Sequence, residues 1–343
     1  FTNSDFETLS EEIEKKIKTK IDWAKEQDDP NPDEEIDDMF ATRTTPVFTN
    51  DESNTETMNF IEAINNGLDE AMEKDEDIFM MGEDIGIFEG AFKATKGLFE
   101  KYGESRVLDT PISEGGFMGA GVGAALAGKK PVIELQFFDF VYPALDQVTT
   151  EAAKYYWKAG KAVPLVVRGP TGAGTRSGPF HSISPESLLA HHPGIKVVAP
   201  SNPYDAKGLL LSAIQDDDPV IFMEHKRLYM KECDVPENME PIPLGKGRIR
   251  RPGKDVTIIA IQRMNLFAEE AAEDMAQEGI DCEIIDPRTY SPLDEELIFE
   301  SVRKTGKVIV VDESNPKCSL ASEITSLISE KCFDDLKAAV IKI

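Results

Sequence analysis

The chain has 343 residues, of which 41% are hydrophobic and 29% are charged, so it is long enough for two domains with a substantial core. Its formal net charge of -27 argues against nucleic acid or an anionic membrane surface as a partner, because both attract clustered lysine and arginine. No apolar run approaches the roughly 20 residues of a membrane-spanning helix.

Residues 1–57 differ in composition from the rest of the chain. They contain 17 acidic and 6 basic residues, which accounts for -11 of the net charge. Apolar residues recur there at helical spacing behind a Ser4-x-x-Glu7 capping box, and they predict one amphipathic helix that ends near Gln27. The acidic, proline-broken stretch that follows predicts an extended linker.

From residue 58 onward, predicted helices alternate with predicted strands. Residues 58–240 therefore predict a mainly parallel sheet covered by helices, and residues 241–343 predict a smaller α/β domain. The predicted strands are 78–81, 107–108, 132–138, 163–168, 197–198, 220–223, 256–261, 282–285, 308–311 and 338–341. The predicted helices are 60–72, a short one ending at 102, one starting at 114, and 144–157, 205–215, 266–277, 295–304 and 320–331.

The cysteines and histidines narrow the possible compartments and sites. The 4 cysteines are widely spaced without a C-x-x-C pair, which predicts reduced thiols and an intracellular location. The 4 histidines occur without H-E-x-x-H or a Cys/His cluster, so the sequence does not predict a zinc site.

Glu114 is the first candidate for chemistry. It is predicted to open a helix behind Ser113, which is placed to cap that helix. Glycine occupies 5 of the next 9 positions, too many for an ordinary surface helix, so another group is expected to approach that backbone closely. The next predicted strand brings Phe137, Phe138 and Phe140 to its carboxyl end, where ligands bind in open parallel sheets.

Each candidate residue also has a purely structural interpretation. The helix dipole alone favours an acid in a first turn, but a carboxyl group beside an aromatic wall favours proton transfer with a raised pKa at Glu114. Glu83 ends a predicted strand in Gly-Glu-Asp and is either a helix cap or a second acid at the same edge. His181 follows a glycine-rich loop and is either a surface residue or a catalytic one.

A dinucleotide fingerprint is an alternative interpretation of the glycine-rich segment. GAGVGA at 119–124 matches G-x-G-x-x-G/A, with Asp139 about 20 residues further on, so a nicotinamide-dependent dehydrogenase stays open. The first glycine of that fingerprint should follow a strand directly, whereas PISEGGFM separates the strand at 107–108 from Gly119.

From about Met58 to Ile343 the chain resembles the beta subunits, or beta halves, of the thiamin-diphosphate-dependent 2-oxo acid dehydrogenases. These are the decarboxylating first components of the pyruvate and branched-chain 2-oxo acid dehydrogenase complexes. The resemblance rests on sequence words that follow in order: MGEDIG with GAFKATKGLFEKYG, DTPISEGGFMGAGVGAALAG, ELQFFDFVYPALDQ, EAAKYYW, RGPTGAG, FHSISPES, HHPGIKVVAPSNPYDAKGLL, DDDPVIFMEHKRLY and EIIDPRTYSPLD. ELQFFDFVYPALDQ, HSISPE, AKGLLLSAI and EHKRLY look closer to the branched-chain members than to the pyruvate members.

The resemblance implies a pyrimidine-binding domain of the thiamin-diphosphate-binding fold over residues 58–240 and a transketolase-like C-terminal domain over residues 241–343. It implies oxidative decarboxylation of branched-chain 2-oxo acids, with transfer of the acyl group to the lipoyl group of an acyltransferase core. Pyruvate and acetoin remain alternative substrates. A non-catalytic assembly module remains an alternative function.

The resemblance also implies roles for single residues. Glu114 matches the glutamate that hydrogen-bonds the pyrimidine ring of thiamin diphosphate and thereby assists deprotonation of the thiazolium carbon. Phe140 matches the aromatic residue that packs on the pyrimidine, Glu83 an acid near the cofactor and subunit interface, and His181 a proton donor on the substrate side. A structural potassium ion is implied, held largely through backbone carbonyls, at Leu165, Ala213, Ile214, Asp216 and Asp218.

Other features of the resemblance concern partners and chain ends. The family's G-D-G…N motif for diphosphate and magnesium lies on the alpha half and is absent here, so this chain is expected to be inactive alone. Its expected partners are an alpha subunit or alpha half, a second beta copy and the lipoylated acyltransferase core.

Residues 1–57 are similar to the end of an alpha subunit, which suggests the C-terminal portion of a fused alpha–beta chain. Members usually carry Gly-Gly-Phe where this chain has PKCSL, and a final strand-to-helix return is missing, so a truncated C-terminus is expected. We expect a cytoplasmic protein in a bacterium, or a mitochondrial-matrix protein in a eukaryote.

Overall fold

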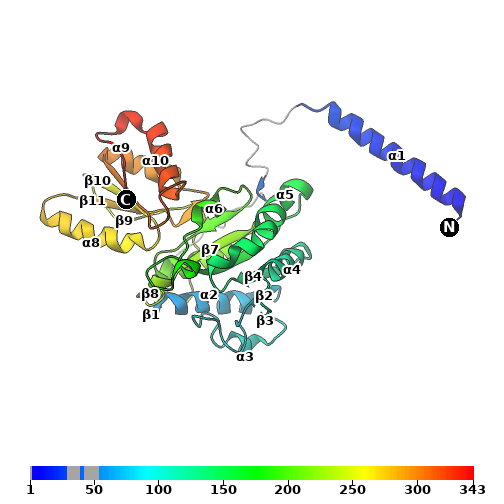
Figure 1. The fold of residues 1–343 in the computed structure, drawn as a ribbon, viewed down its shortest axis with the longest axis horizontal. Coiled ribbons are helices and arrows are strands. Elements are labelled where there is room, and N and C mark those ends of the chain that lie inside the picture. The colour runs from blue at the N-terminus through cyan, green and yellow to red at the C-terminus, as the bar shows by residue number, and fades with distance from the viewer. Residues whose placement is uncertain (1, 29–38, 42–53) are drawn as a thin grey trace. The chain divides into compact units, whose positions relative to one another are not determined.

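The computed structural model describes residues 2–28, 39–41 and 54–343. The chain divides into two units, residues 1–38 and 39–343, which are described separately. In the described part of the first unit, α1 (Asn3–Lys25) forms a single helix without buried residues (Figure 1). No helix in the described ranges has both the length and the apolar content needed to cross a bilayer.

The N-terminal cap of α1 differs from the predicted one. Thr2 is the cap residue and forms the capping box with Asp5, so the predicted Ser4–Glu7 pair is wrong. The Thr2 hydroxyl accepts the Asp5 N–H at 3.3 Å, and Asp5 Oδ2 accepts the Thr2 N–H at 2.6 Å. This pairing satisfies the free N–H groups at the helix start, with a cap that lies two residues earlier than predicted. Ser4 therefore lies inside the helix. The predicted linker lies largely outside the described residues.

The second unit contains a seven-stranded sheet with the strand order β12-β6-β7-β5-β4-β2-β3. The strands from β6 to β3 are parallel, and β12 at one edge runs antiparallel to β6. Their bounds are β2 (Ile78–Gly82), β3 (Val107–Asp109), β4 (Lys130–Glu134), β5 (Val166–Thr171), β6 (Lys196–Val198), β7 (Val220–His225) and β12 (Thr289–Ser291). The predicted mainly parallel sheet is confirmed.

Different helices cover the two faces of this sheet. On one face, Val132 of β4 packs in a cluster with α2 (Phe60–Lys74) and α7 (Pro203–Gln215). On the other face, its neighbour Ile133 packs in a cluster with α4 (Glu114–Leu126). Successive side chains of a strand point to opposite faces, so a strand covered on both sides is apolar throughout. The shorter helices are α3 (Leu98–Tyr102) and α6 (Glu186–Ala190).

The chain after β4 departs from the prediction. The predicted strand 132–138 already ends at Glu134, and a 3₁₀ helix, η2 (Phe138–Ala144), follows. The predicted helix 144–157 consists of a π-helical segment, η3 (Asp146–Ala152), and α5 (Ala153–Ala159). Phe138 is fully buried in the core from this turn, so the apolar run alone did not distinguish a strand from a turn.

A two-stranded antiparallel ribbon precedes the first main helix. β1 (Thr55–Asn59) pairs with β8 (Glu232–Pro236), and neither strand was predicted. Asn59 then caps α2 in a capping box with Glu62.

A second sheet, with the order β14-β13-β10-β11-β9, forms the core of the C-terminal region. Its strands are β9 (Arg248–Arg251), β10 (Val256–Ala260), β11 (Cys282–Asp286), β13 (Val308–Val311) and β14 (Ile341–Lys342), and its helices are α8 (Met264–Gln277), α9 (Glu295–Thr305) and α10 (Leu320–Lys331). Figure 1 shows these elements, coloured yellow to red, gathered beside the green strands of the first sheet. β12 follows β11 in the chain but pairs with β6 of the first sheet. The C-terminal part of the chain therefore supplies the edge strand of the first sheet.

Candidate active site

The sequence-predicted residues Glu83, Glu114, Phe140 and His181 follow neighbouring strands of the large sheet. Glu114 comes after β3, Glu83 after β2, Phe140 after β4 and His181 after β5. Since these strands are parallel and adjacent, their carboxyl ends meet at one edge of the sheet, here called the carboxyl edge. The four residues therefore lie along one edge, where the sequence had predicted Glu83 and Phe140 but had placed His181 only in a loop.

Glu114 is the first residue of α4 and is half-buried. Ser113 is the N-cap residue, as predicted, but its hydroxyl makes no capping hydrogen bond, so that part of the prediction is wrong. Its backbone has ψ of 69°, outside the extended range of most caps, and its carbonyl accepts the N–H groups of Gly116 at 2.9 Å and Phe117 at 3.0 Å instead.

Glu83 supplies the second carboxyl group. The residue is 7% exposed, and its Oε1 atom has no hydrogen-bond partner in the described part of the chain. Burial raises the pKa of Glu83, and the charges of Glu114 and Asp84 raise it further. Two carboxyl groups that interact electrostatically at strand ends, one of them buried and unsatisfied, are typical of a binding or catalytic site.

An aromatic group, formed by Phe92, Phe137, Phe140 and His181, lies at the same edge. The centre of the His181 ring is 4.5 Å from that of Phe137 and 5.7 Å from that of Phe140, and both pairs are edge-to-face. Phe137 also contacts Phe92 at 5.6 Å. Phe138, which the sequence placed with this wall, points into the core instead, because neighbouring residues of the turn face in different directions.

Hydrogen bonds to the Asp139 side chain fix the loop that carries His181. His181 ends the 3₁₀ turn η4 (Pro179–His181), and Asp139 Oδ1 accepts the N–H groups of Ser182 at 2.9 Å and Ile183 at 3.3 Å. Asp139 therefore positions the histidine loop, a role that sequence analysis missed. In the sequence, Asp139 stood out only through its spacing from the GAGVGA segment.

A buried ionic cluster supports the carboxyl edge. The Arg168 guanidinium, 1% exposed, pairs with Glu134 and donates to Glu224 Oε1 at 2.6 Å and Oε2 at 2.8 Å. The Tyr229 hydroxyl donates to Glu224 Oε2 at 2.9 Å. These residues tie β4, β5 and β7 together, and the Tyr229 ring centre lies 5.1 Å from that of Phe92 in the aromatic group, so the cluster supports the strand ends.

The predicted potassium ligands lie elsewhere. The Lys196 ammonium is 2.8 Å from an oxygen of Asp216 and 2.9 Å from one of Asp218, so a protein cation already pairs with both carboxylates. The Leu165 carbonyl accepts the Val220 N–H at 2.8 Å, and the Ala213 carbonyl accepts the Asp216 N–H at 3.3 Å. The described residues hold no group of three His, Cys, Asp or Glu side chains that suits a metal ion. Any potassium site here would depend on backbone oxygens, including that of Ile214, and it stays a prediction.

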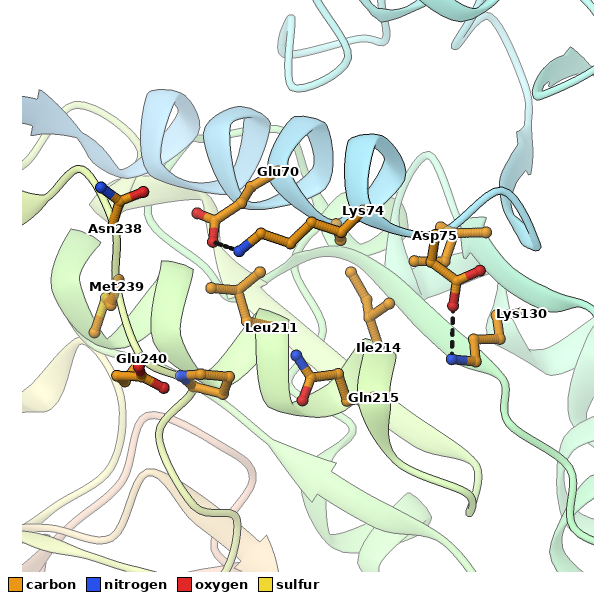
Figure 2. Close-up of a pocket in the computed structure, with 13 residues that line it drawn as sticks. Glu70, Lys74, Asp75, Lys130, Leu211, Ile214, Gln215, Asn238, Met239 and Glu240 are labelled. Carbon is orange, nitrogen blue, oxygen red and sulfur yellow. Dashed lines mark hydrogen bonds and ion pairs between the residues drawn. The ribbon is translucent and has the colours of Figure 1, made fainter. Parts of the chain in front are cut away.

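A separate cavity of about 400 Å³ lies at the opposite edge of the sheet, where β2 and β4 begin (Figure 2). Its lysines are paired, Lys74 with Glu70 at 2.7 Å and Lys130 with Asp75 at 2.8 Å. It contains Ile214 but none of the four candidate residues at the carboxyl edge, so we do not assign the chemistry to it.

The fingerprint glycines lie inside a helix. Gly119 is in the second turn of α4, and a Cβ atom at Gly121 would lie 2.9 Å from Ile133 Cδ1 of β4. These glycines allow close helix–sheet packing and do not form the strand-to-helix turn that a dinucleotide requires.

Comparison with known proteins identifies the family. Residues 56–232 match the transketolase pyrimidine binding domain, and residues 245–343 match the transketolase C-terminal domain. The chain is 45% identical over 286 residues to 2-oxoisovalerate dehydrogenase subunit beta of Bacillus subtilis (strain 168), covering 82% of this chain and 88% of that protein. The chain belongs to this family of dehydrogenase beta subunits.

Other members of the beta-subunit family are equally similar. The chain is 46% identical over 296 residues to acetoin:2,6-dichlorophenolindophenol oxidoreductase subunit beta of the same organism, covering 82% of this chain and 86% of that protein. It is 46% identical over 285 residues to pyruvate dehydrogenase E1 component subunit beta of Acholeplasma laidlawii, covering 82% and 87%. The resemblance predicted from the sequence words is confirmed.

A solved structure shares the fold of this chain. A split gene transketolase, described as an inactive beta4 tetramer, aligns with a TM-score of 0.69 at 22% identity and covers 82% of this chain and 87% of that one. The predicted thiamin-diphosphate-binding fold with a transketolase-like C-terminal domain is thereby confirmed.

The carboxyl edge fits the pyrimidine end of thiamin diphosphate, the cofactor that this family implies. Glu114 is half-buried and Glu83 Oε1 is unsatisfied, so hydrogen-bond acceptors are present. The aromatic group offers ring faces for a planar ligand, and a Cβ at Gly115 would lie 2.9 Å from the Pro143 carbonyl oxygen, so the first turn of α4 needs glycine to approach η2.

Proposed function

We propose that this chain is the beta subunit, or beta half, of a thiamin-diphosphate-dependent dehydrogenase of branched-chain 2-oxo acids. In this reaction the 2-oxo acid is decarboxylated oxidatively and its acyl group passes to the lipoyl group of an acyltransferase core. The observation that carries the proposal is the pair Glu83 and Glu114 beside the aromatic group at one sheet edge, in a chain of this family.

The residues would act as follows. Glu114 would accept a hydrogen bond from the protonated pyrimidine ring, and Phe140 would pack against that ring. Bound thiamin diphosphate would supply the nucleophilic thiazolium carbon and accept the electron pair released on decarboxylation. His181 would donate a proton on the substrate side, and Glu83 would lie near the cofactor at the interface with the alpha half.

The remaining parts of the enzyme would come from other chains. An alpha subunit or alpha half would hold diphosphate and magnesium, so this chain would be inactive by itself. Two alpha–beta units would pair, so that the assembly contains a second beta copy. This assembly would bind the lipoylated core. The domain division at about residue 240, the potassium site and a cytoplasmic or mitochondrial-matrix location belong to the same proposal.

The choice of substrate rests on similarity. HSISPE and EHKRLY look closer to branched-chain members, whereas similar relatives act, by their names, on 2-oxoisovalerate, acetoin and pyruvate. Pyruvate and acetoin are therefore the second candidates. Much of the acyl pocket would belong to the alpha half.

Replacement of Glu114 tests the proposal. In the enzyme assembled with an alpha subunit, we expect Glu114→Ala to lower decarboxylation of 2-oxoisovalerate at least 100-fold, because the variant loses the hydrogen bond to the pyrimidine. Dye reduction driven by 2-oxoisovalerate, pyruvate and acetoin measures both rate and substrate preference.

The exposed Glu104, ten residues earlier, gives the matched control Glu104→Gln, which should keep full activity. Full activity of Glu114→Ala would contradict the proposed role. Absence of turnover in the wild-type assembly with all three substrates would favour a non-catalytic assembly module.

A further inference from the structure

Lys226 is a buried cation that the proposed mechanism does not use. It follows β7 directly, in the 3₁₀ turn η5 (Lys226–Leu228), and so lies at the carboxyl edge. The residue is 6% exposed, and its Nζ atom has no hydrogen-bond partner among the residues that the structure describes. A buried ammonium without a partner is costly, so such a group usually has a ligand.

The surroundings of Lys226 are partly aromatic and partly acidic. Its Nζ atom lies 5.6 Å from the centre of the Phe137 ring, the same ring that contacts His181 at 4.5 Å. Two carboxylates, Asp139 and Glu313, act on it from beyond hydrogen-bond distance. Burial lowers the pKa of Lys226 more than these two charges raise it.

Both acidic neighbours already have other partners. Asp139 Oδ1 accepts the N–H groups of Ser182 and Ile183 in the His181 loop, although its Oδ2 has no hydrogen-bond partner within the described ranges. Glu313 Oε1 is 2.7 Å from His225 Nε2 and accepts the Ala173 N–H at 3.0 Å, and its Oε2 lies 3.8 Å from Arg263. Lys226 therefore has charge partners at long range and unused hydrogen-bond donors at short range among the described residues.

The strand order gives the sequence in which the candidate residues lie along the carboxyl edge. Along the carboxyl edge, Glu114 and Glu83 follow β3 and β2, the Phe137 ring follows β4, His181 follows β5 and Lys226 follows β7. If the pyrimidine lies at the β3 and β2 end, the substrate must enter toward β5 and β7. His181 and Lys226 both lie at that end and both contact the Phe137 ring.

We propose that Lys226 binds the carboxylate of the 2-oxo acid substrate. This inference rests on the proposed function and adds a determinant of substrate class to it. An ammonium group in a water-poor site forms a strong charge-assisted hydrogen bond with a carboxylate, worth about 1.5–3 kcal/mol, whereas a neutral ketone or aldehyde gains nothing comparable. Lys226 thus favours 2-oxo acids over neutral carbonyl compounds.

Substrates with and without a carboxylate test this role. In the assembled enzyme, we expect Lys226→Met to raise KM for 2-oxoisovalerate about 10- to 100-fold, the equivalent of that hydrogen bond. Turnover of 2-methylpropanal, which has the same carbon skeleton without the carboxylate, should change less than about threefold. Lys226→Arg, which keeps the charge, should restore part of the preference for the acid.

Calorimetric binding gives a second measurement that needs no turnover. The 2-hydroxy acid analogue should bind the wild-type assembly more tightly than its uncharged amide, and Lys226→Met should abolish this difference. Equal losses for charged and uncharged compounds would assign Lys226 a merely structural role beneath Phe137. Unchanged binding of the acid would exclude the contact, and a wild-type assembly that neither binds the acid nor turns it over would overturn the proposed function itself.

Discussion

Glu186 is a carboxyl group that the fold keeps away from water. It is 4% exposed at the start of α6, and its Oε2 atom has no hydrogen-bond partner in the described part of the chain. Burial raises the pKa of Glu186 to about 8, with smaller contributions from Asp312 and Glu313. The folded protein therefore holds this proton at neutral pH, while the unfolded chain releases it above its ordinary value of 4.5.

This difference predicts how stability depends on pH. Between about pH 4.5 and pH 8 the folded state binds more protons than the unfolded state, so Glu186 makes the free energy of unfolding fall as pH rises. We expect Glu186→Gln to remove this contribution, which is on the order of 4 kcal/mol. Compared with the wild type at the same pH, the variant should therefore be more stable at pH 8 than at pH 5. Urea unfolding at several pH values, with Glu104→Gln as control, measures the slopes. Identical slopes in the variant and the wild type would contradict the burial argument.

At the scale of single elements, α4 shows what its glycines do. A Cβ at Gly115 would lie 2.9 Å from the backbone oxygen of Pro143 in η2, the turn that carries Phe140, whereas a Cβ at Gly123 would meet no atom within 4 Å. We expect Gly115→Ala to destabilise the fold by about 1–3 kcal/mol and to weaken cofactor binding in the assembled enzyme. Gly123→Ala, in the same helix, should stabilise it by about 0.5–1 kcal/mol.

Denaturant unfolding of both glycine variants distinguishes these positions. Destabilisation at Gly123 equal to that at Gly115 would mean that helix bending, and not close approach, explains the glycines.

Elements were predictable where their pattern is local. The apolar runs of β2, β4 and β10 and the glycine-rich start of α4 each carry their own signal, and all four elements begin near the predicted residues. β1 and β12 pair with β8 and β6, which are distant in sequence, so no nearby pattern marks them. Lys226 was missed because a lysine in a sequence usually marks a surface, and its burial depends on how the strand ends assemble.

At the scale of the whole molecule, the C-terminal region helps to build the carboxyl edge. Gln262 Nε2 donates to the Met223 carbonyl of β7 at 2.9 Å, and Glu313 lies 2.7 Å from His225 at the end of the same strand. Lys226 comes next in the chain. The C-terminal sheet therefore fixes the strand end where we place the substrate, although its own strands hold none of the predicted catalytic residues.

The family and the fold followed from the sequence words because those words span both regions of the chain. The positions of Glu83 and Phe140 at carboxyl ends of strands also followed, because each comes directly after a predicted strand. The strand order that brings His181 to the same edge did not. The unsatisfied Glu83 oxygen and the support of the His181 loop by Asp139 did not, because they depend on side-chain packing.

The central claim is that this chain holds the pyrimidine end of thiamin diphosphate while an alpha partner holds the diphosphate end. Thermal unfolding with thiamin diphosphate and magnesium, of this chain alone and of its assembly with an alpha subunit, tests that claim most directly. A ligand at 100 times its dissociation constant should stabilise the native state by about 2.7 kcal/mol. We predict this stabilisation only in the assembly, with its loss in Glu114→Ala and its retention in Glu104→Gln. Full stabilisation of the isolated chain, or of the assembly that carries Glu114→Ala, would contradict the divided site.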